Sequence, residues 1–214
     1  MLSLVVAVAL ATGRSNLGSA QQARLDDRVE MVARFDQSGT ETYQNQTGAQ
    51  FDEAAPFSLV DAEHNEMLLR SVRTSPAGQE VDVTAVATAD GTLVGSHPSG
   101  IALPPGVLAK AIDGALEDGA ARTGVFDLEG EPVWAVLNSI GGDEPWGVLV
   151  MVEPLVDGWM HHLYEALGPL GHGDGGLTLV DPDGVVVASW DANLIGQRLD
   201  QVPPAGTTPE PVVT

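Results

Sequence analysis

The stretch TAVATADGTLVGSHP, residues 84–98, is the strongest structural signal in this sequence. Polar and apolar residues alternate over 81–88, Asp90 and Gly91 follow, and a second extended run covers 92–96. Alternation with a period of two is typical of a strand that buries one face, and an Asp-Gly pair between two such runs is a strong hairpin signal. The stretch therefore predicts an antiparallel β-hairpin.

The residues after this hairpin predict one helix and three more strands. Two prolines open the helical segment 104–117, as is common in a first helical turn. Three extended runs follow, separated by glycine-containing turns: Arg122–Leu128, Val133–Asn138 and Trp146–Glu153. Residues 81–153 are thus expected to form one five-stranded antiparallel sheet, with the helix inserted after the second strand. The fold class is α+β and resembles the PAS plan, with helices packed on the sheet and a long N-terminal helix.

The N-terminal part is expected to be that long helix. Residues 2–12 (LSLVVAVALAT) form an almost unbroken apolar run without a preceding basic residue. As a helix this run would rise about 16 Å, roughly half of a bilayer's hydrocarbon thickness. We interpret it first as the end of a transmembrane helix, with an incomplete signal peptide or a short buried helix as alternatives. Helical spacing of apolar residues continues to Phe35, which predicts one continuous helix over 1–37.

Two further parts of the chain carry local signals. Ser58, with Asp61 three residues later, resembles a capping box and predicts a helix to about Val72 that buries Met67, Leu68 and Val72. After residue 155 the pattern predicts a helix at 156–167, a glycine-rich loop, and a second hairpin formed by 177–180 and 185–190. The proline-rich tail from Val202 is typical of a linker.

Composition excludes several classes of function. The chain has 9 basic and 30 acidic residues, a formal net charge of −21, and no cysteine. Such a surface repels phosphate backbones and anionic lipid headgroups, so no nucleic-acid partner is expected. Without cysteine there is no disulfide, zinc–thiolate site or cysteine nucleophile.

Three stretches resemble the Cache family of PAS-like extracytoplasmic sensor domains. TAVATADGTLVGSHP (84–98) is similar to the opening hairpin of a Cache lobe, and GEPVWAVLNSIGGDEPWGVLVMVEPL (130–155) to its closing strands. LTLVDPDGVVVASWDANLIGQRL (177–199) is similar to the start of a second lobe, as in a truncated double-Cache module. The resemblance implies a cell-membrane receptor with an extracytoplasmic sensing region, anchored through the N-terminal helix.

The domain organisation follows from this resemblance. The expected parts are a partial transmembrane or signal-type segment at 1–14, a membrane-proximal helix and polar loop at 15–54, a PAS-like Cache lobe at 55–155, a connecting helix and glycine-rich loop at 156–175, and the start of a second lobe with a proline-rich tail at 176–214.

The resemblance also implies where a ligand would bind. In PAS-like domains a ligand lies between the concave face of the sheet and the segment inserted after the second strand, here 95–121. The expected ligand-binding residues are His97, Arg122, Trp134, Asn138 and Trp146, with Arg122 as the partner of a carboxylate. Trp134 and Asn138 would share one face of their strand. The alternative is that both tryptophans are ordinary core residues and Arg122 makes a surface ion pair.

No catalytic, cofactor or metal site is expected. Gly141-Gly142-Asp143-Glu144 resembles the start of a diguanylate cyclase loop, but Pro145 follows it and a hairpin turn is favoured. His161 and Glu165 could share a helix face, yet the H-E-x-x-H pattern is absent. Asp181 and Asp183 lack the other ligands of a calcium loop.

Three hypotheses for function remain. The leading one is a ligand-sensing domain, not itself an enzyme, of a histidine kinase, diguanylate cyclase, phosphatase or chemoreceptor. The second is a structural module that forms a homodimer through the 15–37 helix and binds no small molecule. The third is an enzyme domain within the unassigned termini.

Overall fold

A computed structural model describes residues 57–70, 83–156, 178–181, 183–189 and 191–199, with 6–8 and the single positions 27, 30, 31, 34 and 158. The chain forms two compact units. The first contains residues 38–154 together with 1–3, and the second contains 4–37 and 155–214. The predicted helix at 156–167, the glycine-rich loop and the proline-rich tail lie outside the described residues.

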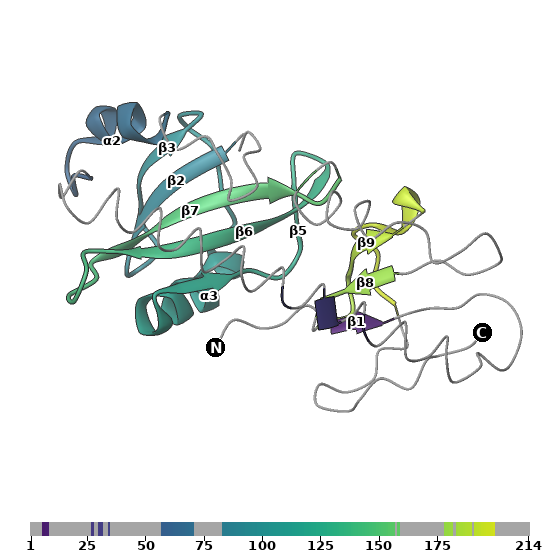
Figure 1. The fold of residues 1–214 in the computed structure, drawn as a ribbon. Coiled ribbons are helices and arrows are strands. Elements are labelled where there is room, and N and C mark those ends of the chain that lie inside the picture. Colours follow the sequence, from purple (N-terminus) through teal and green to yellow (C-terminus); the bar gives the residue numbers. More distant parts are fainter. Residues whose placement is uncertain are drawn as a thin grey trace, which may run out of the picture. The chain divides into compact units, whose positions relative to one another are not determined.

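The first unit is built on a six-stranded antiparallel sheet (Figure 1). Its strands run in the order β3-β2-β7-β6-β4, and β5 also pairs with β6. Their bounds are β2 Val83–Thr88, β3 Leu93–His97, β4 Ala120–Arg122, β5 Phe126–Leu128, β6 Glu131–Ile140 and β7 Gly147–Pro154. This is the α+β, PAS-like plan that the sequence predicts, with helix α3 (Pro105–Asp118) inserted after the second strand of the sheet.

The predicted opening hairpin is confirmed as β2 and β3. Its turn has Gly91 at φ 85°, a left-handed conformation that glycine adopts without steric cost. The Asp90 carboxylate accepts a hydrogen bond from the Thr92 N–H at 3.0 Å and another from the Thr88 hydroxyl. These bonds lower the pKa of Asp90, the Thr88 hydroxyl contributing most.

The predicted third strand, Arg122–Leu128, is instead two short strands. Both β4 and β5 pair with β6, in separate registers, so the sheet has six strands and not five. Thr123 marks the interruption, because its hydroxyl accepts a hydrogen bond from the Ala135 N–H at 2.9 Å. The side chain therefore takes up a backbone donor at the point where strand pairing changes.

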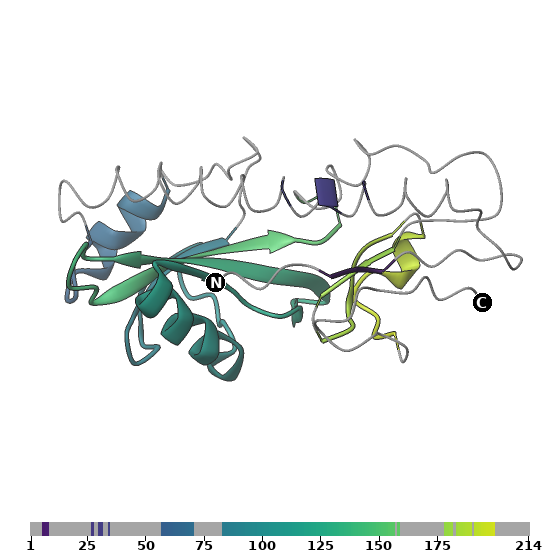
Figure 2. The same ribbon diagram turned by 60° about the horizontal axis from the view of Figure 1, so that its bottom comes forward.

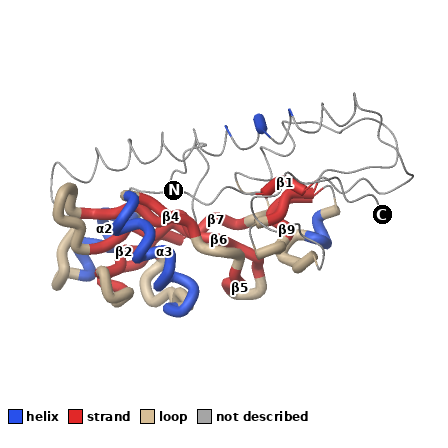
Figure 3. Tube along the Cα trace, turned by 90° about the horizontal axis from the view of Figure 1, so that it is seen from below, coloured by secondary structure: helices blue, strands red, loops and turns tan. Residues whose placement is uncertain are grey.

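Helices α3 and α2 (Ala62–Leu69) pack on opposite faces of the sheet (Figure 2). The α3 face holds one apolar cluster, which joins α3 to every second residue of β2, β6 and β7. On β6 these residues are Val133, Ala135 and Leu137. The other face carries a second apolar cluster that includes Leu69 of α2 and Val136 of β6. Figure 3 shows both helices against the strands from a third direction.

Helix α2 begins later than the capping-box pattern predicts. Asp61 is its N-cap and accepts a hydrogen bond from the His64 N–H at 2.9 Å, while the Ser58 hydroxyl accepts from Asp61 N–H at 3.1 Å in the turn before it. The predicted buried side was also wrong for Met67, whose exposed fraction is 61%. Asn65 and Leu69 are buried instead, because they are four residues apart on one helix face.

The N-terminal segment differs from the predicted continuous helix over 1–37. Val6–Val8 forms strand β1 and pairs antiparallel with β8. A run rich in β-branched valine favours an extended strand when a sheet edge is at hand. Asp27, Glu30, Met31 and Arg34 are helical, as expected. Among the described residues no helix is long and apolar enough to cross a membrane, and the membrane anchor stays a prediction.

The second unit contains the other predicted hairpin. Strands β8 (Thr178–Val180) and β9 (Val186–Ser189) pair antiparallel, and the 3-10 helix η1 (Ala192–Leu194) follows. Asp181 shapes the turn, since its Oδ1 accepts from the N–H groups of Asp183 at 2.9 Å and Val185 at 2.8 Å. The Gly184 N–H also donates to the Asp181 carbonyl at 3.0 Å, which closes the turn that the sequence predicts.

Candidate functional site

The sheet face opposite α3 carries the buried polar side chains of Thr84, Asn138 and Glu153. Trp134, Val136 and Asn138 share this face of β6, as predicted, but they point away from α3 and from the inserted segment. The expected position of the ligand, between the sheet and the segment 95–121, was therefore wrong for these residues. The α3 face is formed by the alternate, purely apolar residues of β6, and α3 packs directly against them.

Arg122, Trp134 and Glu153 form a polar cluster on this face. The Arg122 guanidinium carbon lies 4.2 Å from the centre of the Trp134 ring, which is a cation–π contact. The Trp134 indole N–H donates to Glu153 Oε2 at 3.3 Å. Trp134 is only 2% exposed and Glu153 5%. The cluster brings together a cation, an aromatic ring and a carboxylate from the three strands β4, β6 and β7.

The strand registers explain why these three side chains meet. Trp134 on β6 is paired with Glu153 on β7, and Arg122 on β4 is paired with Val136 on β6. Arg122 and Trp134 are thus diagonal neighbours on one face, within reach of a long and an aromatic side chain. Alternation within each strand then sends all three side chains to the same side.

Asn138 lies on the same face of β6, four residues from Trp134. It is 5% exposed, and neither its Nδ2 nor its Oδ1 has a hydrogen-bond partner within the described part of the chain. Its register partners are Ala120 on β4 and Leu149 on β7, whose side chains have no polar atom. Buried amides are normally hydrogen-bonded, so this one is an exception that calls for an explanation.

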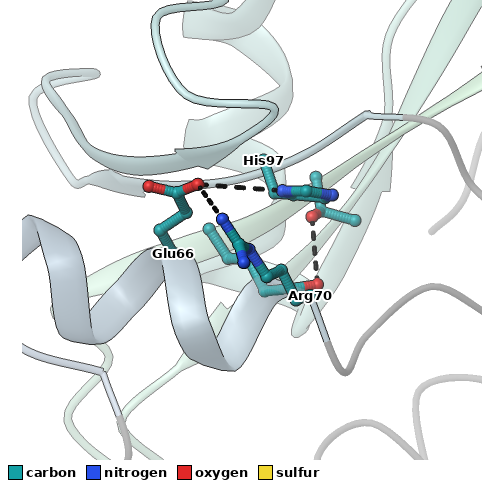
Figure 4. Close-up of polar contacts among 5 residues, drawn as sticks. Glu66, Arg70 and His97 are labelled. Carbon is teal, nitrogen blue, oxygen red and sulfur yellow. Dashed lines mark hydrogen bonds and ion pairs between the residues drawn. The ribbon is translucent and has the colours of Figure 1, made fainter.

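His97 lies at the end of β3, beside helix α2 (Figure 4). Its Nδ1 is 4.0 Å from Glu66 Oε1, and the same oxygen accepts from Arg70 Nη2 at 2.9 Å. The Thr84 hydroxyl, on the strand paired with β3, donates to the Leu69 carbonyl at 3.4 Å. These contacts connect the end of α2 to the sheet edge at His97.

The predicted site residues do not form a single group. His97, Thr84, Met151, Val136 and Arg122 occupy one row across five strands. Four strand spacings place the ends of this row roughly 19 Å apart. Trp146 lies in the β6–β7 turn, where its backbone N–H donates to the Ile140 carbonyl at 3.0 Å. Its side chain packs on the cluster that contains Leu69.

Arg122 and Trp134 are therefore in contact, and Asn138 lies on the same face of the sheet. His97 lies at the end of β3, and Trp146 lies in the β6–β7 turn. Sequence reasoning missed Glu153 and Asn65 as partners. Glu153 carried a usable signal, because a carboxylate in the valine-rich strand 147–154 is unusual for a buried strand. Asn65 carried none, since its role depends on a distant strand.

No group of three or more His, Cys, Asp or Glu residues that could hold a metal ion occurs among the described residues. The histidines and acids weighed as metal ligands at 161–174 lie outside that part of the chain. The Gly141–Glu144 segment forms the β6–β7 turn, with Glu144 N–H donating to the Gly141 carbonyl at 3.2 Å. This is the hairpin turn that the sequence predicts.

No protein-family model matches the chain, and no curated protein matches it. Among solved structures, the chain is similar to the ligand-binding domain of the Pseudomonas aeruginosa amino acid chemoreceptor PctB in complex with L-Gln. The two are 18% identical, with a TM-score of 0.43, over 76% of this chain and 69% of that one.

It is also similar to the ligand-binding domain of the Pseudomonas fluorescens chemoreceptor CtaA in complex with L-serine. That pair is 15% identical with a TM-score of 0.45, over 83% of this chain and 78% of that one. The periplasmic sensory domain of the Campylobacter jejuni chemoreceptor Tlp1 is 13% identical with a TM-score of 0.38, over 84% and 72%. All three TM-scores are below 0.5, and the description of the fold rests on the strand order and registers of this chain.

Proposed function

We propose that this chain is the extracytoplasmic ligand-sensing domain of a membrane-bound signalling receptor. The observation that carries the proposal is the buried face of the sheet that holds Arg122, Trp134 and Glu153, together with Asn138, whose amide has no hydrogen-bond partner among the described residues. Burying such groups costs stability unless they are paired, and a binding face is one reason to retain them. The PAS-like strand order and the Cache-like sequence stretches support the same assignment.

The ligand would be a small carboxylate. Arg122 supplies a delocalised cation, Trp134 a flat apolar wall, and Asn138 a donor and an acceptor. Arg122 lies on β4 at the sheet edge and is partly buried, so it can contact a ligand without leaving its position over the Trp134 ring. Such a ligand would stabilise the bound conformation and change the equilibrium between states of the receptor.

A thermal-shift screen of organic acids, amino acids and amines on the 214-residue chain tests this proposal. For an acid that raises the melting temperature, Arg122→Ala should remove the shift while the domain stays folded. Arg122→Lys should retain only part of it, since lysine lacks the planar fork. Arg70→Ala is the matched control, because it also removes one arginine but from an exposed ion pair on α2.

Unchanged affinity in Arg122→Ala would contradict the proposed site. If no compound of the screen binds and light scattering shows a stable dimer, the dimerisation function is favoured instead.

A further inference from the structure

Two asparagines are buried on the α2 side of the sheet, and their side-chain amides differ in hydrogen bonding. Asn65 is fully buried, its Nδ2 donates to the carbonyls of Ser58 at 2.6 Å and Val94 at 2.9 Å, and its Oδ1 accepts from Ser58 N–H at 2.6 Å. Asn138 is 5% exposed, and its side-chain amide makes no hydrogen bond to any described residue. Asn65 therefore has a structural role, whereas the structure gives Asn138 none.

The surroundings of Asn138 cannot satisfy its amide. Its neighbours across the strands, Ala120 and Leu149, are apolar. The backbone groups nearby are already used, since Asn138 lies in the ladders with β4 and β7 and the Ser139 N–H donates to the Gly119 carbonyl at 2.9 Å. A partner with both a donor and an acceptor has to come from outside this part of the sheet.

We infer that Asn138 is the subsite for a carboxamide group of the ligand. This inference rests on the function proposed above and names the ligand class more closely: a small carboxylic acid that also carries a primary carboxamide. A carboxamide satisfies the Asn138 donor and acceptor together, whereas a carboxylate can only accept. The acid group of the same molecule faces Arg122.

The spacing of the two residues suits a short molecule. Arg122 is paired with Val136, and its guanidinium lies over Trp134, on the other side of Val136 from Asn138. Trp134 and Asn138 are four residues apart, roughly 13 Å along β6, and this length limits the distance that the ligand has to cover. A four-carbon chain with one hydrogen bond at each end covers a separation of this size. Succinamate is therefore a suitable probe, with succinate and succinamide as matched compounds that lack one of the two groups.

Calorimetric titration of the 214-residue chain with the three probes tests the inference. Succinamate should bind more tightly than either matched compound. Asn138→Leu, which removes both polar atoms at similar volume, should weaken succinamate binding at least roughly tenfold and weaken succinate binding less, because a carboxylate loses one hydrogen bond and a carboxamide loses two. Asn138→Ser provides a second variant with reduced hydrogen bonding if the leucine variant does not fold.

Stability of the ligand-free chain provides an independent measurement. Asn138→Leu should raise the urea midpoint, because it removes a buried amide that has no hydrogen-bond partner among the described residues. Thr84→Val on the same face is the matched control and should lower the midpoint, because the Thr84 hydroxyl has a hydrogen bond to lose. If Asn138 had a structural role, Asn138→Leu would lower the urea midpoint.

Equal succinamate affinity in wild type and Asn138→Leu would overturn the inference, as would a lowered midpoint in that variant. If other acids bind through Arg122 but succinamate does not, the carboxamide class is wrong and the sensing function stands. If no acid of any kind binds, the proposed function fails as well.

Discussion

The two faces of the six-stranded sheet are built from the same strands, but they differ in the polarity of their buried side chains. Towards α3, alternate residues of β2, β6 and β7 are buried and apolar, and they form one cluster with the helix. On the other face, the buried polar side chains of Thr84, Asn138 and Glu153 lie among apolar residues. The first face provides cohesion, because apolar burial is non-directional. The second face carries directional groups, and these can distinguish one ligand from another.

Leu137 and Asn138 show the contrast within two adjacent residues. Leu137 is fully buried in the α3 cluster, and Asn138 is buried on the opposite face without a partner among the described residues. Successive strand residues point to opposite sides, so one position belongs to the core and the next to the candidate site.

The largest effect is expected for Leu137→Asn. The variant loses a buried leucine and places an amide among apolar groups that cannot pair with it. We expect the free energy of unfolding to fall by about 3–5 kcal/mol. Urea unfolding monitored by tryptophan fluorescence measures this loss. A loss below about 1 kcal/mol would show that the α3 face tolerates buried polar groups as the other face does.

An intermediate effect is expected for Gly95→Ala, which tests how closely α2 docks on the polar face. An added Cβ at Gly95 would lie 2.6 Å from Asn65 Cβ, closer than real Cβ atoms approach. Helix α2 must shift, which should cost about 1–3 kcal/mol and increase hydrogen exchange in α2.

Gly106→Ala is the matched control for this prediction. An added Cβ there meets nothing within 4 Å, and the position lies in helix α3. Alanine should be neutral or stabilising by up to about 1 kcal/mol. Equal effects of the two substitutions would mean that α2 is not held tightly by Asn65.

The smallest effect is expected for Asp90→Asn, in the turn that joins β2 to β3 and belongs to neither face. Hydrogen bonds, chiefly from the Thr88 hydroxyl and then from Thr92 N–H, lower the pKa of Asp90 below its ordinary value of 3.8. A lowered pKa contributes stability above the ordinary value, and this is lost as the pH falls through the lowered value. Wild type should therefore be slightly more stable than the variant at neutral pH, with the difference shrinking below pH 3.8. A difference that grows in acid would contradict the assignment.

Much of the first unit could be predicted from the sequence because its signals are local. The hairpin at β2 and β3, helix α3 and the strands β6 and β7 all follow from alternation and turn residues. The missed division of β4 from β5 has a non-local cause, since the Thr123 hydroxyl binds the Ala135 N–H twelve residues away in sequence. The missed strand β1 likewise depends on its partner β8, which is distant in the chain.

For the candidate site, the sequence by itself determined that Trp134 and Asn138 share a face, because side chains alternate along a strand. It also placed Arg122 on the neighbouring strand. Only the tertiary structure decided which face meets α3, because alternation is the same for both assignments and cross-strand register settles the choice. The contact of Arg122 and Glu153 with Trp134, and the lack of any partner for Asn138 among the described residues, were decided there too. Both depend on which residues of separate strands come to lie opposite one another.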